Sequence, residues 1–193
     1  MSYKKTTDLR VRRTKDAIQE TFKNMMCEMP PDKITVKELA ERARINRKTF
    51  YLHYTSIEGL YNEMLQIVAR GYYDEVEKLP IPTSIADLTN TFFRYFSSQG
   101  EYVENLICNP DYQIYCNQLF RATLKHNRDQ HNPYEKFSET KQQIINLFLV
   151  NSTLDIYREW VASGKELSIE DIIDLTGKLL YSGIHGLQQQ QTL

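Results

Sequence analysis

Hydrophobic residues recur at intervals of three and four along most of this chain, and no segment keeps a strict alternation of apolar and polar residues. The first spacing is typical of amphipathic α-helices, whereas alternation would indicate β-strands. The pattern therefore predicts an all-α protein. The first helix is expected from about Arg12 to Glu28, because Pro30-Pro31 ends it. Its buried stripe is expected to hold Ile18, Phe22, Met25, Met26 and Met29.

Two short helices are predicted after these prolines. The second helix begins at the capping box TVKE, in which the Thr35 side chain caps the amide three residues on and Glu38 reaches back. After a turn at Arg44-Ile45, Asn46 is a good cap for a third helix through Tyr54. A fourth helix is expected from Ser56 to about Lys78. The tight turn, with the small Ala40 at the helix crossing, predicts a helix-turn-helix over about 35–54.

The third helix carries polar residues that its own core does not need. Phe50 and Tyr54 are spaced i, i+4 toward the inside, while Arg47 and Tyr51 form a second such pair turned outward. An arginine there offers the bidentate fork that suits guanine, and hydroxyl or imidazole groups can donate to phosphates. The residues expected to contact DNA are Arg47, Lys48, Thr49, Tyr51 and His53. An ordinary polar helix face is the alternative.

The charge distribution agrees with a DNA partner. The net charge is only -1, but residues 1–54 hold 13 Lys and Arg against 7 Asp and Glu, whereas residues 55–193 hold 11 against 18. A positive lobe attracts polyanions, and an acidic remainder repels them. A run of charge that is only solvated would give the same counts. The charge distribution therefore supports a DNA partner only together with the exposed face of the third helix.

These segments resemble the TetR family of bacterial transcription regulators. RRTKDAIQETF, ITVKELAERARINRKTFYLHY and SIEGLYNEM match its N-terminal domain almost continuously from about Arg12 to Leu65. The INR, TFY and HY of the third helix look most like a branch common in low-GC Gram-positive bacteria. The resemblance implies a homodimer that binds a palindromic operator in double-stranded DNA under a C-terminal signal. By position it also adds Thr35, Val36 and Lys37 to the DNA contacts.

The resemblance divides the chain into a DNA-binding domain at 1–56 and a larger regulatory and dimerisation domain at 57–193. Three features depart from the family pattern. Arg44 stands where many relatives have glycine, so it must adopt a left-handed conformation that costs about 1 kcal/mol. Thr55 and Ile57 replace lysines that hold phosphate, and Gly59 replaces a common acidic residue. A basic arm can compensate, or can remain solvated; it comprises Lys4, Lys5, Arg10, Arg12, Arg13 and Lys15.

The last two helices carry apolar seams at spacings of three and four. Such helices suit a bundle, and the resemblance assigns them to the dimer. Glycine in a helix costs about 1 kcal/mol, so close backbone approach would explain the glycines here. Seams filled within one monomer are the alternative. The expected interface comprises Leu147, Leu154, Val161, Ile172, Leu179, Gly183 and Leu187.

Of the 22 aromatic residues, 14 lie after residue 78. Aromatic side chains with polar tips suit a cavity for a small-molecule effector, although helically spaced aromatics are more often core than pocket. The residues expected to line such a pocket are Phe96, Tyr102, Tyr115, Phe120, Phe148 and Trp160.

Other classes of function find little support. The chain has no glycine-rich phosphate loop, no HExxH and no nucleophile elbow, so no enzyme activity and no cofactor are expected. Cys108, Cys116, His126 and His131 are separated by 8, 10 and 5 residues, which does not match zinc-ligand pairs, so no metal is expected. The N-terminus lacks a signal-peptide core, and the longest apolar run, IINLFLV, is too short for a membrane span. A cytoplasmic protein with free thiols is expected.

The leading hypothesis is a sequence-specific DNA-binding regulator, acting as a repressor. An alternative keeps the DNA-binding domain but places a protein partner, not a small molecule, on the C-terminal domain. A helical adaptor that binds no DNA is a third hypothesis, and heparin retention with a gel shift separates it from the others.

Overall fold

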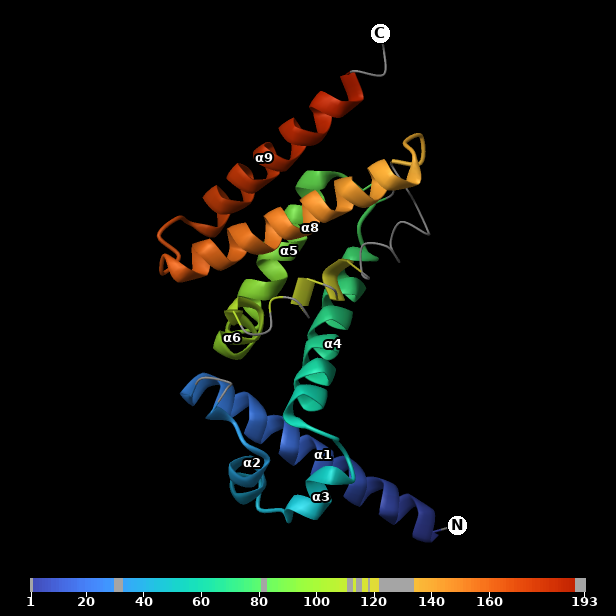
Figure 1. Ribbon diagram of the computed structural model, residues 1–193, viewed down its shortest axis with the longest axis vertical. Helices are drawn as coiled ribbons and strands as arrows, with labels where there is room; N and C mark the ends of the chain where they lie inside the picture. Colours follow the sequence, from blue (N-terminus) through green and yellow to red (C-terminus); the bar gives the residue numbers. More distant parts are fainter. Residues whose placement is uncertain are drawn as a thin grey trace. The chain divides into compact units, whose positions relative to one another are not determined.

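The computed structural model describes residues 2–29, 33–80, 83–110, 113, 116–117, 119–121 and 134–189, with side chains from residue 9 to residue 183. Every secondary-structure element in these ranges is a helix, which confirms the predicted all-α class (Figure 1). The chain forms two compact units, Met1–Ile67 and Val68–Leu193. The boundary falls inside α4 (Ile57–Val76), which begins in one unit and ends in the other.

The first unit begins with α1 (Ser2–Glu28), which starts ten residues before the predicted Arg12. The prediction was wrong because residues 2–11 contain no proline or glycine, so the helix extends backwards from its packed part at little cost. Ile18, Phe22, Met25 and Met26 are buried as expected. Met29 lies beyond the helix end and is only half-buried.

Local capping defines the next two helices. In α2 (Val36–Arg42), the Thr35 hydroxyl accepts a hydrogen bond from the Glu38 amide at 3.2 Å. The Glu38 carboxylate accepts from Arg42 at 2.9 Å. Arg42 also bonds to Glu28, and this bond is the main cause of its raised pKa. The end of α1 is thereby tied to α2.

The third helix, α3, is shorter than predicted and spans Arg47–Tyr51. Asn46 caps it, because its side-chain oxygen accepts from the Lys48 amide at 2.8 Å. Beyond Leu52 the backbone turns, and the amides of His53 and Tyr54 donate to the Phe50 carbonyl at 2.9 and 3.0 Å. Phe50 and Tyr54 are buried, as predicted.

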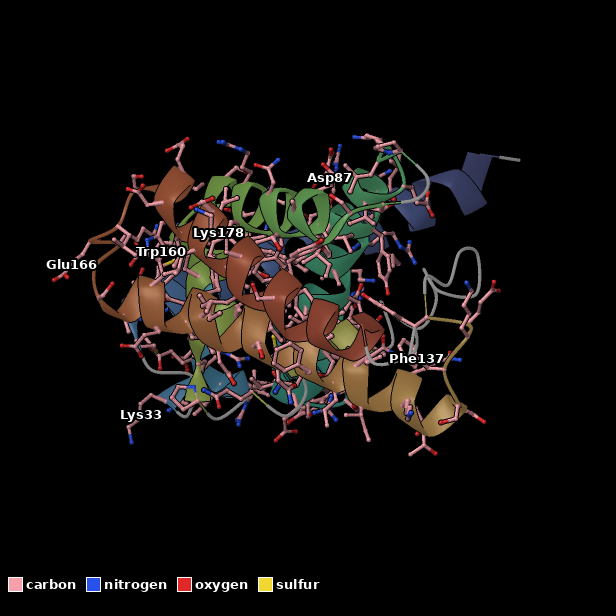
Figure 2. The ribbon with its side chains drawn as sticks, turned by 90° about the horizontal axis from the view of Figure 1, so that it is seen from above. Lys33, Asp87, Phe137, Trp160, Glu166 and Lys178 are labelled. Atoms are coloured by element: carbon pink, nitrogen blue, oxygen red, sulfur yellow. The ribbon has the colours of Figure 1, made fainter. Side chains whose placement is uncertain are left out.

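The second unit contains α5 (Ile85–Ser98), α6 (Glu101–Cys108), α8 (Glu139–Ala162) and α9 (Ile169–Gln189). The helices α8 and α9 run antiparallel and side by side, and α5 packs along α9 (Figure 1). The turn between α8 and α9 carries Glu166 outward (Figure 2). The Trp160 indole nitrogen donates to the Leu167 carbonyl at 2.9 Å and fixes this turn.

Two interactions hold the interior of the second unit. Aromatic rings form one cluster, in which Phe92 lies 4.7 Å from Phe96 and 5.6 Å from Tyr157 between ring centroids. The buried Arg158 of α8 donates to the Ile107 carbonyl at 3.0 Å, to Asp155 at 3.0 Å and to Asn117 at 3.1 Å. This guanidinium ties the end of α6 to α8. No helix in the described ranges is both long and apolar enough to cross a membrane.

Candidate DNA-binding surface

The turn between α2 and α3 determines which side of α3 is exposed. The Arg44 amide donates to Glu41 at 3.1 Å, and the Ile45 amide donates to Ala40 at 2.9 Å. Arg44 has a φ of 54°, the left-handed conformation that the sequence analysis expected there. The nearly inaccessible Ala40 lets the two helices approach closely. The turn thus presents one face of α3 to solvent.

That face is basic and accessible. Arg47 and Lys48 are exposed, and the Tyr51 side chain is 57% exposed. The Tyr51 ring stands edge-on to Phe50, with 5.6 Å between centroids, so the core supports it from behind. The buried Phe50 ring therefore limits the directions in which the Tyr51 side chain can move.

The two cations on this face are not neutralised. Some other cations of the unit do have carboxylate partners: Lys15 lies 2.5 Å from Glu63, and Arg42 bonds to Glu28 and Glu38. Within the described ranges, neither Arg47 nor Lys48 forms an ion pair. Their charges therefore remain available to an anionic ligand.

The other predicted contact residues fall into two groups. Lys37 is exposed and Val36 is half-buried near the start of α2, while the Thr35 hydroxyl accepts the capping bond. Thr49 and His53 are half-buried, and the His53 ring lies 6.4 Å from Tyr54. The structure thus exposes Lys37, Arg47, Lys48 and Tyr51 most fully, and it leaves Thr49 and His53 with narrower access.

Sequence reasoning missed two parts of this surface. Leu52 is 83% exposed beside Tyr51, and its offset of two residues from the buried Phe50 could have placed it outside. A shallow hollow of about 450 Å³ also lies against α1. Its lining is Leu9, Arg10, Arg13, Thr14, Ala17 and Ile45. Part of the predicted basic arm is therefore helical and lies beside the turn that precedes α3.

Comparison with known proteins bears on this unit directly. Residues 25–64 match the model of the family described as bacterial regulatory proteins, tetR family. That stretch contains the end of α1, all of α2 and α3, and the start of α4. The first unit therefore resembles the N-terminal domain of the tetR family over this stretch. No curated protein matches the chain.

Solved structures extend the likeness to the fold of the whole chain. A TetR regulator from Streptococcus agalactiae matches with a TM-score of 0.69 and 21% identity, covering 91% of this chain and 97% of that one. FadR from Bacillus subtilis, in complex with stearoyl-CoA, matches with a TM-score of 0.59 and 13% identity. This match covers 86% of this chain and 97% of FadR. SmeT, the repressor of a multidrug efflux pump in Stenotrophomonas maltophilia, matches with a TM-score of 0.61 and 14% identity. This match covers 88% of this chain and 89% of SmeT. At these identities the likeness shows a TetR-type fold, including the helical C-terminal unit.

The matched family is one of regulatory proteins, and the solved structures reported above are likewise described as regulators or a repressor. Burial raises the pKa of Cys108 and of Cys116 to about 11, which disfavours the nucleophilic thiolate of each. Among the described residues, no group of three or more His, Cys, Asp or Glu could hold a metal ion. His126 and His131 lie outside these residues.

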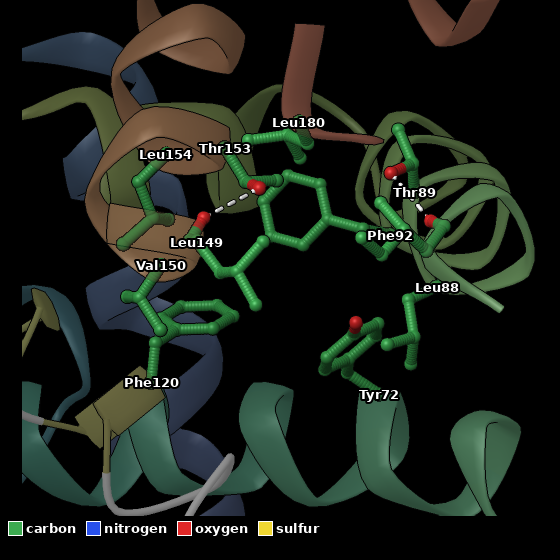
Figure 3. A pocket seen from close by; sticks show the side chains of 11 residues that line it. Tyr72, Leu88, Thr89, Phe92, Phe120, Leu149, Val150, Thr153, Leu154 and Leu180 are labelled. Atoms are coloured by element: carbon green, nitrogen blue, oxygen red, sulfur yellow. Dashed lines mark hydrogen bonds between the residues drawn. The ribbon is translucent and has the colours of Figure 1, made fainter. Parts of the chain in front are cut away.

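The residues predicted to line an effector pocket do not form one cavity wall. Phe96 and Trp160 are buried in the aromatic cluster, Tyr102 is half-buried, and Phe148 is 42% exposed. Phe120 does line a cavity, together with residues that the sequence analysis did not select (Figure 3). Tyr115 lies outside the described residues.

The residues predicted for the dimer interface also separate into two sets. Leu154 and Ile172 are only 1% and 4% exposed, so they already pack inside one chain. Leu147 and Leu179 are 40% and 55% exposed, Gly183 is exposed and Val161 is half-buried. The side chain of Leu187 is outside the described range. Only the outer residues are free to meet a second copy.

Proposed function

We propose that this chain is a cytoplasmic, homodimeric transcription repressor that binds a palindromic operator through α3 of each protomer. A signal received by the second unit controls operator binding. SmeT, a repressor of the same fold, is the precedent for repression, whereas DhaS, which also shares the fold, is an operon activator.

The observation that carries the proposal is the face of α3 formed by Arg47, Lys48 and Tyr51. It is exposed, cationic and supported from behind by Phe50. Such a face suits insertion into a major groove, where side chains at the start of a recognition helix reach base edges. Lys37 and Thr35, at the start of α2, are suited to backbone phosphates.

An exposed apolar patch on α8 and α9 supports the dimer. It comprises Ile144, Leu147, Phe148, Leu175 and Leu179, each 40–60% exposed. Exposed apolar side chains of this kind are favourable to bury against another copy. At Gly183, an added Cβ would lie 3.3 Å from the Phe148 ring, so α8 and α9 are close together at this point.

Two recognition helices in one dimer would enter successive major grooves about 34–36 Å apart. A signal would act by shifting the dimer between a form that matches this spacing and one that does not, which requires different ligand affinities for the two forms. Contacts to phosphates would make binding depend on salt. Each neutralised phosphate contributes about -0.9 to the slope of log affinity against log salt concentration.

The test begins with selection of bound sites from random DNA by the full chain. Arg47→Ala should then weaken binding to the selected site by about 1–3 kcal/mol and relax preference at one base pair. Arg47→Lys is the matched control, because it keeps the charge and loses the bidentate fork. It should retain the salt slope and lose the base preference.

If each of the two variants loses the same amount of affinity for every DNA sequence, Arg47 contacts a phosphate and not a base. Selection that enriches no sequence at low salt would reject the DNA-binding proposal itself.

A protein partner is the second candidate for the controlling signal. An open groove of about 820 Å³ runs between α5 and α9, and Asp87 and Lys178 lie on its two sides (Figure 2). This groove is large and charged enough for a peptide segment, which is the observation that favours a partner. If a cell extract releases the protein from its operator and protease treatment of that extract abolishes the release, a protein partner is supported. If the releasing factor survives heating and passes through a dialysis membrane, a small molecule is supported.

A further inference from the structure

Leu52 ends the exposed face of α3 with an apolar side chain that the core does not use. It is the C-cap of the helix, and it is 83% exposed, more than any other large hydrophobic residue in the described part of the chain. The core beneath it is filled by Phe50 and Tyr54, which are 0% and 5% exposed. The fold therefore gains little from a leucine at this position.

The backbone places Leu52 in a row with a cation. Leu52 keeps helical angles, with a φ of -74° and a ψ of -20°, so the periodicity of α3 extends to it. Residues four apart lie above one another on a helix, which pairs Arg47 with Tyr51 and Lys48 with Leu52. Within the described ranges, neither cation forms an ion pair. Each row thus begins with an available charge and ends with an exposed aromatic or apolar side chain.

A ligand that matches both rows carries negative charge beside apolar groups. DNA has this combination at its major groove, where phosphates border a floor that holds the C5-methyl group of each thymine. An exposed leucine gains from burial against that methyl group, because both apolar groups leave water. It would gain nothing from a phosphate or from a base edge that offers only hydrogen-bonding groups. The leucine therefore favours thymine among the four bases.

We propose that Leu52 recognises one thymine in each half-site of the operator by contact with its C5-methyl group. No other base presents a methyl group at this edge, so the contact distinguishes thymine from the other three. The inference rests on the proposed function, operator binding through α3, and deepens it by naming a base that this face recognises and the chemical group that is recognised.

Deoxyuridine tests the proposal, because it lacks the C5-methyl group of thymine and keeps its O4 acceptor and its pairing with adenine. Each thymine of the site selected from random DNA is replaced in turn by deoxyuridine, in both half-sites, and binding of the full chain is titrated. One position should lose about 4-fold in affinity per half-site, the effect of burying one methyl-sized group. In Leu52→Ala, the thymine and deoxyuridine sites should bind equally at that position.

Two variants serve as controls. Leu52→Met keeps a long apolar side chain and should keep most of the deoxyuridine penalty. Ile67→Ala removes another exposed aliphatic side chain of the same unit, 50% exposed on α4, and should keep all of it. Because Leu52 is so exposed, Leu52→Ala should leave Tm unchanged, which separates a lost DNA contact from a damaged fold.

Two results would overturn the proposal while operator binding stands. One is a selected site at which no deoxyuridine weakens binding of the unaltered chain. The other is a penalty that persists in full in Leu52→Ala, which would assign the methyl contact to another side chain of the face. A chain that enriches no site from random DNA would overturn operator binding and this contact together, so the two failures are distinguishable.

Discussion

At the scale of single residues, Gly71 shows how a position with no visible pattern can restrict packing. A Cβ added to Gly71 would lie 2.2 Å from the Tyr95 hydroxyl oxygen, closer than any real contact. That hydroxyl donates to the Val68 carbonyl at 2.9 Å, and the Tyr95 ring stacks edge-on with Phe96 at 5.0 Å. Tyr95 therefore cannot move away without losing these contacts.

Gly71→Ala should accordingly lower the free energy of unfolding by about 1 kcal/mol, because overpacking costs more than the gain in helix propensity. Gly177→Ala is the control, since nothing lies within 4 Å of its added Cβ. It should be neutral or stabilising by up to about 1 kcal/mol. Urea unfolding of both variants measures the change in the free energy of unfolding at each glycine. Tyr95→Phe removes the obstructing oxygen, so it should reduce the cost of Gly71→Ala. Equal effects at both glycines would contradict the packing argument.

At the scale of elements, α3 depends on its cap more than on its length. It has only five residues, and a helix of that length is not stable alone. The Asn46 cap, the turn through Arg44 and the buried Phe50 hold it in place. The face proposed for DNA is consequently only as ordered as this cap and this turn.

Asn46→Ala should therefore cost about 1 kcal/mol of stability and also weaken operator binding, because α3 would be less well formed. Asn46→Ser restores an uncharged capping oxygen and should recover most of both losses. Thermal unfolding and a binding titration on the selected site measure the two effects. An alanine variant with unchanged stability would show that packing alone maintains α3.

At the scale of the whole molecule, the function proposed here requires two copies. One protomer presents one recognition face, and operator binding by a linked pair gains about 100-fold or more over a single half-site. The exposed apolar patch of α8 and α9 is the surface expected to join them.

Leu179→Glu should place a carboxylate in that surface, so the chain should sediment as a monomer at micromolar concentration and lose about 100-fold in operator affinity. Tyr181→Glu is the matched control, because this residue is similarly exposed on the same helix but lines the groove against α5. It should leave the dimer intact. A monomeric unaltered chain at that concentration would remove the two-half-site mechanism.

The sequence by itself determined the helical class, the helix-turn-helix and the outward side of α3. These follow from local signals: Thr35 and Asn46 cap the helices to which they are attached, and the spacing of Phe50 and Tyr54 against Arg47 and Tyr51 lies within two helical turns. The start of α1 escaped prediction, since no residue between Ser2 and Val11 opposes a helix or marks its beginning.

Only the tertiary structure decided which apolar residues of the last two helices face inward. Leu147 and Leu154 both fit the same seam, yet one is 40% exposed and the other is 1% exposed. The difference depends on neighbours contributed by other helices, which no spacing within α8 specifies. For the same reason the cavity that Phe120 lines and the constraint at Gly71 were visible only once α4, α5 and α8 had been packed together.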